Sequence, residues 1–336
     1  MSVKSQGQWS RRTILEGSLL AGLGSWVPGM LRAAEEAAAT FAGLPPITKA
    51  IPSTGERIAA IGLGTNAFTS AQYPELREVL KRMNELGGAL IDTASDYDDS
   101  EAVIGRALAE LGVRNRMFIS TKCISENGWP RWVSSPDKVE KTYGQESFDR
   151  SLQRLRTKQI DLMLAHHIRS VDGIMPKLIE WKQAGLARYI GIATFRWFEH
   201  REMMEKMRQY PIDFIQLDYS IGNREAAEDV LRLAAERRIA VLVDVPFKYR
   251  ADWGSHGDSM LPSVARVPLP PWAAEIAVTS WSQFILKYAI SHPAVTCAIP
   301  GTTNVSHLVE NQLAGRGPLP DAAMRTRMED YWDAVT

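Results

Sequence analysis

The sequence predicts an α/β protein that folds into a single (β/α)8 TIM barrel. Eight short apolar runs, rich in β-branched residues, alternate with longer stretches of helical period, which is typical of βα units and a parallel sheet. A barrel of this kind takes about 250 residues or more, and the 336-residue chain accommodates one after an N-terminal segment is set aside. We find no internal repeat, low-complexity tract or linker that would argue for a second domain.

The first predicted element is a β-hairpin that precedes the barrel. Residues 47–60 read ITKAIPSTGERIAA, in which two short alternating apolar runs flank a Ser-Thr-Gly turn. We expect this hairpin to cap the bottom of the barrel. The whole domain is expected to span residues 47–336.

The barrel strands and their helices follow in order along the chain. Apolar runs rich in β-branched residues predict strands at 58–63, 89–92, 117–122, 160–166, 188–193, 214–218, 240–245 and 295–300. Apolar residues at helical spacing predict helices at 74–86, 101–111, 147–155, 173–184, 198–209, 225–237 and 279–290. In such a barrel the carboxyl ends of all strands meet at one mouth.

Residues 1–39 are expected to be a twin-arginine signal peptide with a short leader, outside the fold. Residues 10–15 read SRRTIL, and a moderately apolar run follows at 17–31. Glu16 and the glycines make that run too polar and too short for a good transmembrane helix. We therefore expect export to the periplasm, with the twin-arginine (Tat) export machinery as a partner. Cleavage is expected after Ala39 or Ala34, and an uncleaved anchor is the alternative.

Composition limits the class of protein. Lys+Arg and Asp+Glu both number 39, and the sequence pI is near 7.0. This balance is ordinary for a globular protein and gives no electrostatic footprint for nucleic acid, so neither a nucleic-acid partner nor stable membrane insertion is expected. The two cysteines are too few for a disulfide framework, and we expect Cys123 and Cys297 to be buried packing residues.

Four polar side chains, Asp92, Tyr97, Lys122 and His166, stand at or just after the ends of predicted strands. They converge on one mouth if those runs are parallel strands of one barrel. A phenol has a pKa near ~10, and an adjacent ammonium favours the phenolate, so Lys122 is expected to lower the pKa of Tyr97. Asp92 would hold the lysine charged and oriented. The simpler alternatives are a capping role for Asp92, rim packing for Tyr97 and a solvated Lys122.

From the hairpin to Asn311 the chain resembles the aldo-keto reductases. The matching phrases, in order, are GLGT at 62–65, DTA at 92–94 with Tyr97 and Glu101, GRAL at 105–108, STK at 120–122, SLQRL at 151–155, IDL at 160–162 with His166, GI at 191–192, Gln216, and IPG at 299–301 with EN at 310–311. Their order and spacing together make the resemblance specific.

The resemblance implies an NAD(P)H-dependent oxidoreductase that reduces an aldehyde or ketone to an alcohol, with NADPH as cofactor and a small carbonyl compound as substrate. Asp92, Tyr97, Lys122 and His166 would then be catalytic, with Tyr97 as general acid and His166 hydrogen-bonded to the carbonyl oxygen. The implied cofactor-binding residues are Gly64, Thr65, Thr194, Gln216, Phe247, Pro300, Gly301, Thr302, Thr303, His307, Glu310 and Asn311.

The chain departs from that family where the cofactor is held. Many members present Ser-Asn after strand five, and here Ala193 and Thr194 leave one hydroxyl. Asp244 stands where the family commonly carries an aromatic that stacks on the nicotinamide, so we expect Phe247 or another loop aromatic to replace it. Gly301 and His307 stand at positions that are often basic, which leaves NADH as the alternative to NADPH.

Substrate recognition is expected from two long loops, at 124–143 and 248–271. Trp129, Trp132 and Trp253 are the candidate pocket residues, although loop aromatics also serve as rim packing. We expect no metal site, because His166 and His167 are adjacent in a strand and neighbouring strand residues point apart.

Two other functions remain open on the sequence alone. One is a nucleotide-binding barrel with a regulatory or redox-sensing role and little turnover. The other is a barrel that uses the same lysine and acid for lyase or isomerase chemistry without a nucleotide.

Overall fold

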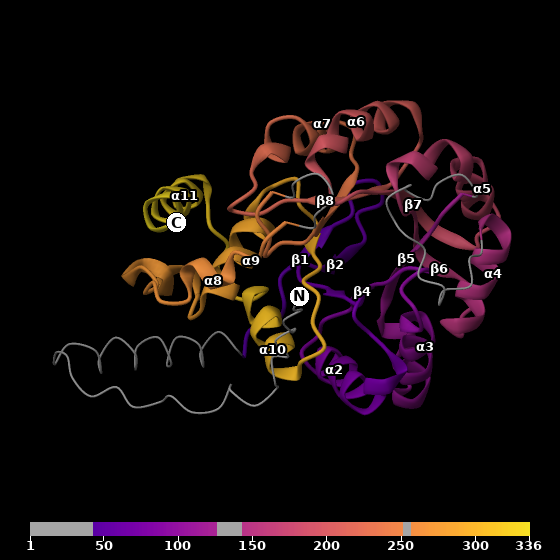
Figure 1. Ribbon diagram of the computed structural model, residues 1–336, viewed down its shortest axis with the longest axis horizontal. Helices are drawn as coiled ribbons and strands as arrows, with labels where there is room; N and C mark the ends of the chain where they lie inside the picture. Colours follow the sequence, from indigo (N-terminus) through magenta and orange to yellow (C-terminus); the bar gives the residue numbers. More distant parts are fainter. Residues whose placement is uncertain (1–42, 126–142, 251–256) are drawn as a thin grey trace, which may run out of the picture.

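The computed structural model describes residues 43–125, 143–250 and 257–336. Its centre is an eight-stranded parallel sheet whose strands lie side by side in chain order (Figure 1). The strands are β3 (Leu63–Gly64), β4 (Leu90–Asp92), β5 (Phe118–Cys123), β6 (Ile160–Ala165), β7 (Ala187–Ala193), β8 (Phe214–Asp218), β9 (Ala240–Asp244) and β10 (Cys297–Ala298).

The sheet closes on itself into a barrel. Parallel bridges join Ile61 to Ala298 and Gly64 to Gly301, which brings the last strand beside the first. The backbone N–H of Gly62 donates to the carbonyl of Ala298 at 2.8 Å across this seam. The predicted (β/α)8 barrel is therefore confirmed.

Helices cover the outside of the barrel and connect its strands (Figure 1). They are α2 (Tyr73–Glu85), α3 (Ser100–Leu111), α4 (Gly144–Arg154), α5 (Val171–Gln183), α6 (His200–Gln209), α7 (Val230–Glu236), α9 (Trp281–Ser291) and α10 (Val305–Ala314). The predicted helix at 225–237 is broken into a 3-10 turn (Glu225–Ala227) and α7. Three of the helices in the described residues were not predicted: α10, the short α8 (Leu261–Val264) and the C-terminal α11 (Ala322–Val335).

A two-stranded hairpin closes the bottom of the barrel, as expected. Strand β1 (Thr48–Ala50) pairs antiparallel with β2 (Arg57–Ala59), and Ile51 and Ile58 are buried in the apolar cluster inside the barrel. The start of the predicted first barrel strand, at residue 58, was wrong. Ile58 belongs to the hairpin, and the chain needs the residues after it to turn into the barrel before β3 begins.

The interior of the barrel changes from apolar to polar along the strands. Because alternate residues of a strand share a face, the residues that point inward follow a period of two. The lower layers hold the apolar side chains of Leu90, Phe118, Leu162, Phe214, Leu242 and other members of the interior cluster. Two or four residues further along the same strands come Asp92, Lys122, Gln216 and Asp244, and His166 follows β6. The fold thus gathers its polar inward side chains at the carboxyl-end mouth.

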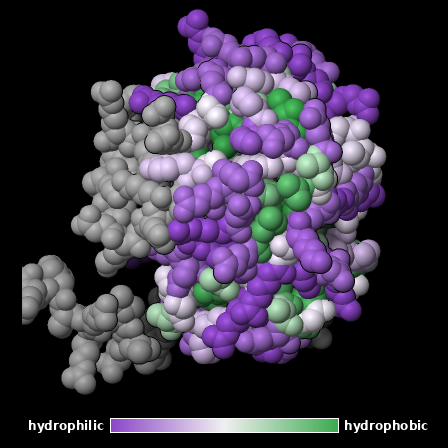
Figure 2. Space-filling view, turned by 90° about the vertical axis from the view of Figure 1, so that its right-hand side faces the viewer, coloured by the Kyte–Doolittle hydropathy of each residue, from purple (hydrophilic) through white to green (hydrophobic). Residues whose placement is uncertain are grey.

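The described surface is mostly polar. Figure 2 shows one face in which hydrophobic areas are small and separated by hydrophilic side chains. Leu44 is the one large hydrophobic residue that is exposed among the described residues. Within the same ranges, none of the helices combines the length and the apolar character that a membrane crossing requires. Cys123 and Cys297 are free and buried, as predicted.

Candidate functional site

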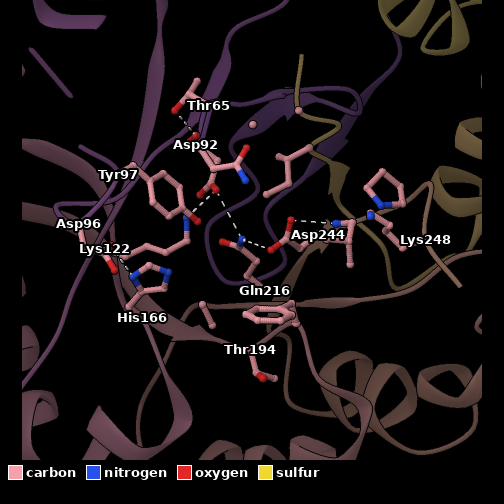
Figure 3. Close-up of a pocket in the computed structure, with 18 of the residues that line it drawn as sticks. Thr65, Asp92, Asp96, Tyr97, Lys122, His166, Thr194, Gln216, Asp244 and Lys248 are labelled. Atoms are coloured by element: carbon pink, nitrogen blue, oxygen red, sulfur yellow. Dashed lines mark hydrogen bonds and ion pairs between the residues drawn. The ribbon is translucent and has the colours of Figure 1, made fainter. Parts of the chain in front are cut away.

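A cavity of about 650 Å³ opens at the mouth of the barrel, a size typical of small-molecule sites. Figure 3 shows side chains from the ends of several strands pointing into it. The cavity brings together many of the residues singled out in the sequence: Gly64, Thr65, Asp92, Tyr97, Lys122, His166, Thr194, Gln216, Phe247 and Gly301.

Asp92 and Lys122 form a buried ion pair at the bottom of this cavity. Lys122 Nζ lies 2.5 Å from Asp92 Oδ2, and the two side chains are 1% and 4% exposed. The ammonium also donates to the carbonyl of Thr93 at 2.8 Å, and the other carboxylate oxygen accepts from Ser120 Oγ at 2.8 Å. An ammonium has three protons, so one remains for a further acceptor in the cavity.

Tyr97 stands on the loop after β4, next to this pair. Lys122 Nζ lies 5.1 Å from the centre of the phenol ring, and the ring of His166 meets it edge-on at 5.5 Å between centroids. Desolvation in the cavity, followed by the charges of Asp92, Asp244 and Asp96, raises the pKa of Tyr97 well above its usual value. The expectation that Lys122 lowers this pKa was therefore wrong for the protein alone. Burial is the largest cause, and the charges of Asp92, Asp244 and Asp96 outweigh that of the ammonium, which Asp92 pairs at 2.5 Å.

His166 and His167 both line the cavity, contrary to the expectation that they point apart. Strand β6 ends at Ala165, so the alternation of a strand no longer applies to the two histidines. Their rings stack at 4.4 Å between centroids with an interplanar angle of 8°. His166 Nδ1 lies 2.8 Å from Asp96 Oδ1. Burial, followed by the charge of His166, lowers the pKa of His167 well below its usual value.

Gln216 links two carboxylates across the cavity floor (Figure 3). Its Nε2 donates to Asp244 Oδ2 at 3.1 Å and to Asp92 Oδ2 at 3.4 Å. Burial, and then the charge of Asp92, raise the pKa of Asp244. The Oε1 of Gln216 is buried and has no hydrogen-bond partner among the described residues. A buried amide oxygen of this kind is an acceptor ready for a ligand N–H.

Thr194 lines the cavity, but its hydroxyl group is already engaged. Thr194 Oγ1 donates to Glu199 Oε2 and accepts from the backbone N–H of Arg196 at 3.2 Å. The hydroxyl that we expected to bind the cofactor therefore holds the loop after β7.

The segment after β10 leads from the cavity into α10. Gly301 lines the cavity, and Pro300 accepts a backbone hydrogen bond from Gly64 at 3.2 Å. Asn304 caps α10, since its Oδ1 accepts from the N–H groups of Ser306 and His307. The remaining residues proposed from the sequence for this segment, Thr302, Thr303, His307, Glu310 and Asn311, follow outside the residues that line the cavity.

Sequence analysis missed two cavity carboxylates and one cation, Asp96, Asp98 and Lys248. Asp96 and Asp98 flank Tyr97 directly in the sequence, and that position next to a candidate catalytic residue could have identified them. Asp98 adopts a φ of 42°, a left-handed conformation that aspartate and asparagine tolerate better than most residues. The predicted substrate residues Trp129, Trp132 and Trp253 lie outside the described residues.

The chain is similar to known proteins over most of the barrel. A model of the aldo/keto reductase family matches residues 60–249. Methylglyoxal reductase DkgB of Salmonella typhi is 40% identical over 144 residues, which are 41% of this chain and 48% of that protein, so the match spans about half the relative's length. The oxidoreductase YqkF of Bacillus subtilis is 27% identical over 276 residues, 76% of this chain and 86% of that protein.

A solved structure shares the fold. An aldo-keto reductase from Klebsiella pneumoniae, in complex with NADPH, has a TM-score of 0.64 with 20% sequence identity, covering 85% of this chain and 95% of that chain.

Proposed function

This chain belongs to the aldo/keto reductase family, and on that premise we propose that it is an NAD(P)H-dependent oxidoreductase that reduces an aldehyde or ketone to an alcohol. The observation that carries the proposal is the Asp92–Lys122 pair, 2.5 Å apart and buried, beside Tyr97 and His166 in one cavity. These four side chains supply the proton and the orientation that carbonyl reduction requires.

Tyr97 is the general acid in this proposal. Its raised pKa keeps the phenol protonated at neutral pH, so the proton is present when negative charge develops on the carbonyl oxygen. An alkoxide is a stronger base than a phenolate, so the transfer remains downhill. Lys122 stabilises the phenolate that forms, and Asp92 keeps the ammonium in place. His166, across the ring of Tyr97, orients the carbonyl oxygen.

A nicotinamide nucleotide, when bound, would supply the hydride. The cavity fits such a group, because the orphaned Oε1 of Gln216 can accept the N–H of a carboxamide. Gly301 leaves space for a ligand at the seam of the barrel, because an added Cβ there would meet no atom closer than 3.6 Å. We propose NADPH as the cofactor, with NADH as the alternative, and the Klebsiella pneumoniae structure with NADPH supports the choice.

The substrate is proposed to be a small aldehyde or ketone. The relative named methylglyoxal reductase supports placing small dicarbonyl compounds in the first panel of substrates. Export by the twin-arginine pathway is also proposed, on the paired arginines of residues 10–15. A variant with Arg11→Lys and Arg12→Lys should stay in the cytoplasmic fraction if that pathway exports the protein, and unchanged periplasmic recovery would refute it.

Single-turnover kinetics test the proposed reaction. Protein preloaded with NADPH is mixed with a panel of aldehydes and ketones, and loss of reduced nicotinamide is followed by absorbance. Oxidation that depends on the carbonyl and is lost in Tyr97→Phe supports the proposal. Tight nucleotide binding without Tyr97-dependent oxidation would instead favour a regulatory nucleotide-binding barrel. Failure to bind either nucleotide would exclude both.

A further inference from the structure

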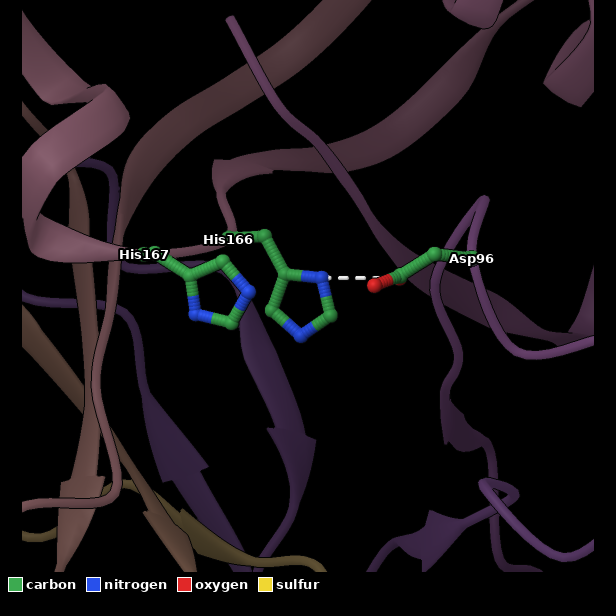
Figure 4. A group of neighbouring side chains, drawn as sticks. All are labelled: Asp96, His166 and His167. Carbon is green, nitrogen blue, oxygen red and sulfur yellow. Dashed lines mark ion pairs between the residues drawn. The ribbon is translucent and has the colours of Figure 1, made fainter. Parts of the chain in front are cut away.

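Three side chains at one edge of the cavity have the chemistry of metal ligands. Asp96 comes from the loop after β4, and His166 and His167 follow β6 (Figure 4). Their potential ligand atoms all lie within 4.8 Å of one another. We refer to these three residues as the Asp96 cluster. No other such group of histidine, cysteine or acidic residues occurs in the described ranges.

Two atoms of the cluster face each other as an ion pair whose geometry is not that of a regular hydrogen bond. His166 Nδ1 and Asp96 Oδ1 are 2.8 Å apart, yet each is buried and lacks a hydrogen-bond partner of acceptable geometry among the described residues. His166 as a whole is only 7% exposed. A buried pair without regular hydrogen-bond geometry is satisfied only in part, and an ion that binds both atoms would satisfy both.

The spacing of the three side chains can be compared with that of ligands around one metal ion. Nitrogen and oxygen ligands at about 2.1 Å from a shared tetrahedral ion lie about 3.4 Å apart. The Asp96–His166 distance of 2.8 Å is about 0.6 Å shorter than this, and the wider spacing in the cluster, up to 4.8 Å, requires a movement of about 1 to 2 Å. Rotation of the His167 ring out of its parallel stack on His166 would direct one of its nitrogen lone pairs toward the same point.

The surrounding charge favours a cation. Asp92, Asp98 and Asp244 also line the cavity, while the ammonium of Lys122 is paired with Asp92. Even with Lys248 counted, carboxylates outnumber ammonium groups among the residues that line the cavity, which favours a cation beside the Asp96 cluster.

We propose that Asp96, His166 and His167 bind one divalent transition-metal ion of the zinc type, with its remaining coordination positions open to the cavity. Two imidazoles and one carboxylate suit Zn²⁺ and its neighbours better than the all-oxygen sites that Ca²⁺ and Mg²⁺ prefer. The site rests on the geometry of these three side chains and does not depend on the reductase activity.

Zinc titration of the full protein tests the site without any nucleotide or carbonyl. Metal-free protein without a polyhistidine tag is titrated with ZnCl₂ by calorimetry near neutral pH. We expect one saturable site per chain, whose affinity falls at least about tenfold in Asp96→Asn and in His167→Ala. Asp98→Asn is the matched control, because it removes the same charge from the same loop and asparagine tolerates the left-handed backbone there. That control removes only a nearby charge and no ligand, so its zinc affinity should fall less than about threefold.

Two further measurements exclude unfolding of a variant and zinc binding elsewhere on the protein as explanations. Circular dichroism and thermal unfolding of each metal-free variant establish that it is folded, and anomalous diffraction at the zinc edge locates the ion. Density between Asp96, His166 and His167 supports the proposal. It is overturned if no saturable binding occurs, if Asp98→Asn loses as much affinity as Asp96→Asn, or if the ion lies elsewhere.

Discussion

Removing the cation from the buried ion pair should destabilise the whole barrel. In Lys122→Met the side-chain volume is nearly conserved, but the carboxylate of Asp92 keeps only Ser120 Oγ at 2.8 Å and Gln216 Nε2 at 3.4 Å as partners. Both members of the pair are almost fully buried, at 1% and 4% exposure, so solvent screens their charges poorly. The free energy of unfolding should therefore fall strongly.

The size of the effect follows from the geometry. At 2.5 Å, an effective dielectric constant of about 20 gives an attraction of about 7 kcal/mol. Desolvation of the two ions offsets much of this attraction, and breaking a buried pair from one side costs about 3 to 5 kcal/mol. Because Asp92→Asn together with Lys122→Met removes both charges, that double variant should lose less stability than the sum of the two single variants.

Urea unfolding at pH 7, followed by tryptophan fluorescence, measures all four proteins of this double-mutant cycle. We expect about 3 to 5 kcal/mol for Lys122→Met and a coupling energy of about 2 kcal/mol or more. A cost below about 1 kcal/mol for Lys122→Met, or additive single costs, would refute the buried pair as a main stabilising contact of the mouth.

Three further outcomes are expected. Tyr97→Phe keeps the edge contact with His166 but lacks the phenolic proton, so kcat/KM should fall about 100- to 10,000-fold. Nucleotide affinity, measured by titration, should be unchanged. Retained turnover would exclude Tyr97 as the general acid. Gly191→Ala would place a Cβ 2.2 Å from a backbone oxygen of the neighbouring strand, so the free energy of unfolding in urea should fall by about 3 kcal/mol. Gly301→Ala should lower it little, because no atom lies closer than 3.6 Å to an added Cβ. Equal losses in the two variants would contradict this. Burial and two nearby cations lower the pKa of His292 to about 4, so the folded protein binds a proton at His292 less readily than the unfolded chain does. The free energy of unfolding should therefore fall as the pH falls from about 6.5 toward about 4. His292→Asn should flatten the stability profile in that window, and an unchanged profile would contradict the assignment.

The barrel could be predicted from the sequence because its strands and helices differ in hydrophobic period, and that period is a local property. The errors lie where local signals overlap. Ile58 belongs to an apolar run that continues into the first barrel strand, so the sequence could not separate the hairpin from β3. The helix predicted at 225–237 has a continuous helical pattern, but the chain turns within it before α7 begins.

The convergence of Asp92, Tyr97, Lys122 and His166 could also be anticipated, since parallel strands in a barrel bring their carboxyl ends together. How those side chains influence one another could not. The pKa of Tyr97 depends on distances to Asp92, Asp244 and Asp96, which come from different loops and strands. The hydroxyl of Thr194 is taken by Glu199, a contact that depends on how the loop after β7 folds back.

The residue types at the mouth of the barrel follow from the sequence, because the period of two in the strands and the order of the βα units are local features of the chain. The tertiary structure decided their electrostatics and their partners. Asp96 meets His166 only because the loop after β4 lies against the end of β6, and His167 turns into the cavity only because β6 ends at Ala165. Hydrogen bonds need direct contact and charge interactions weaken with distance through space, so both are set by the folded geometry and not by separation along the chain.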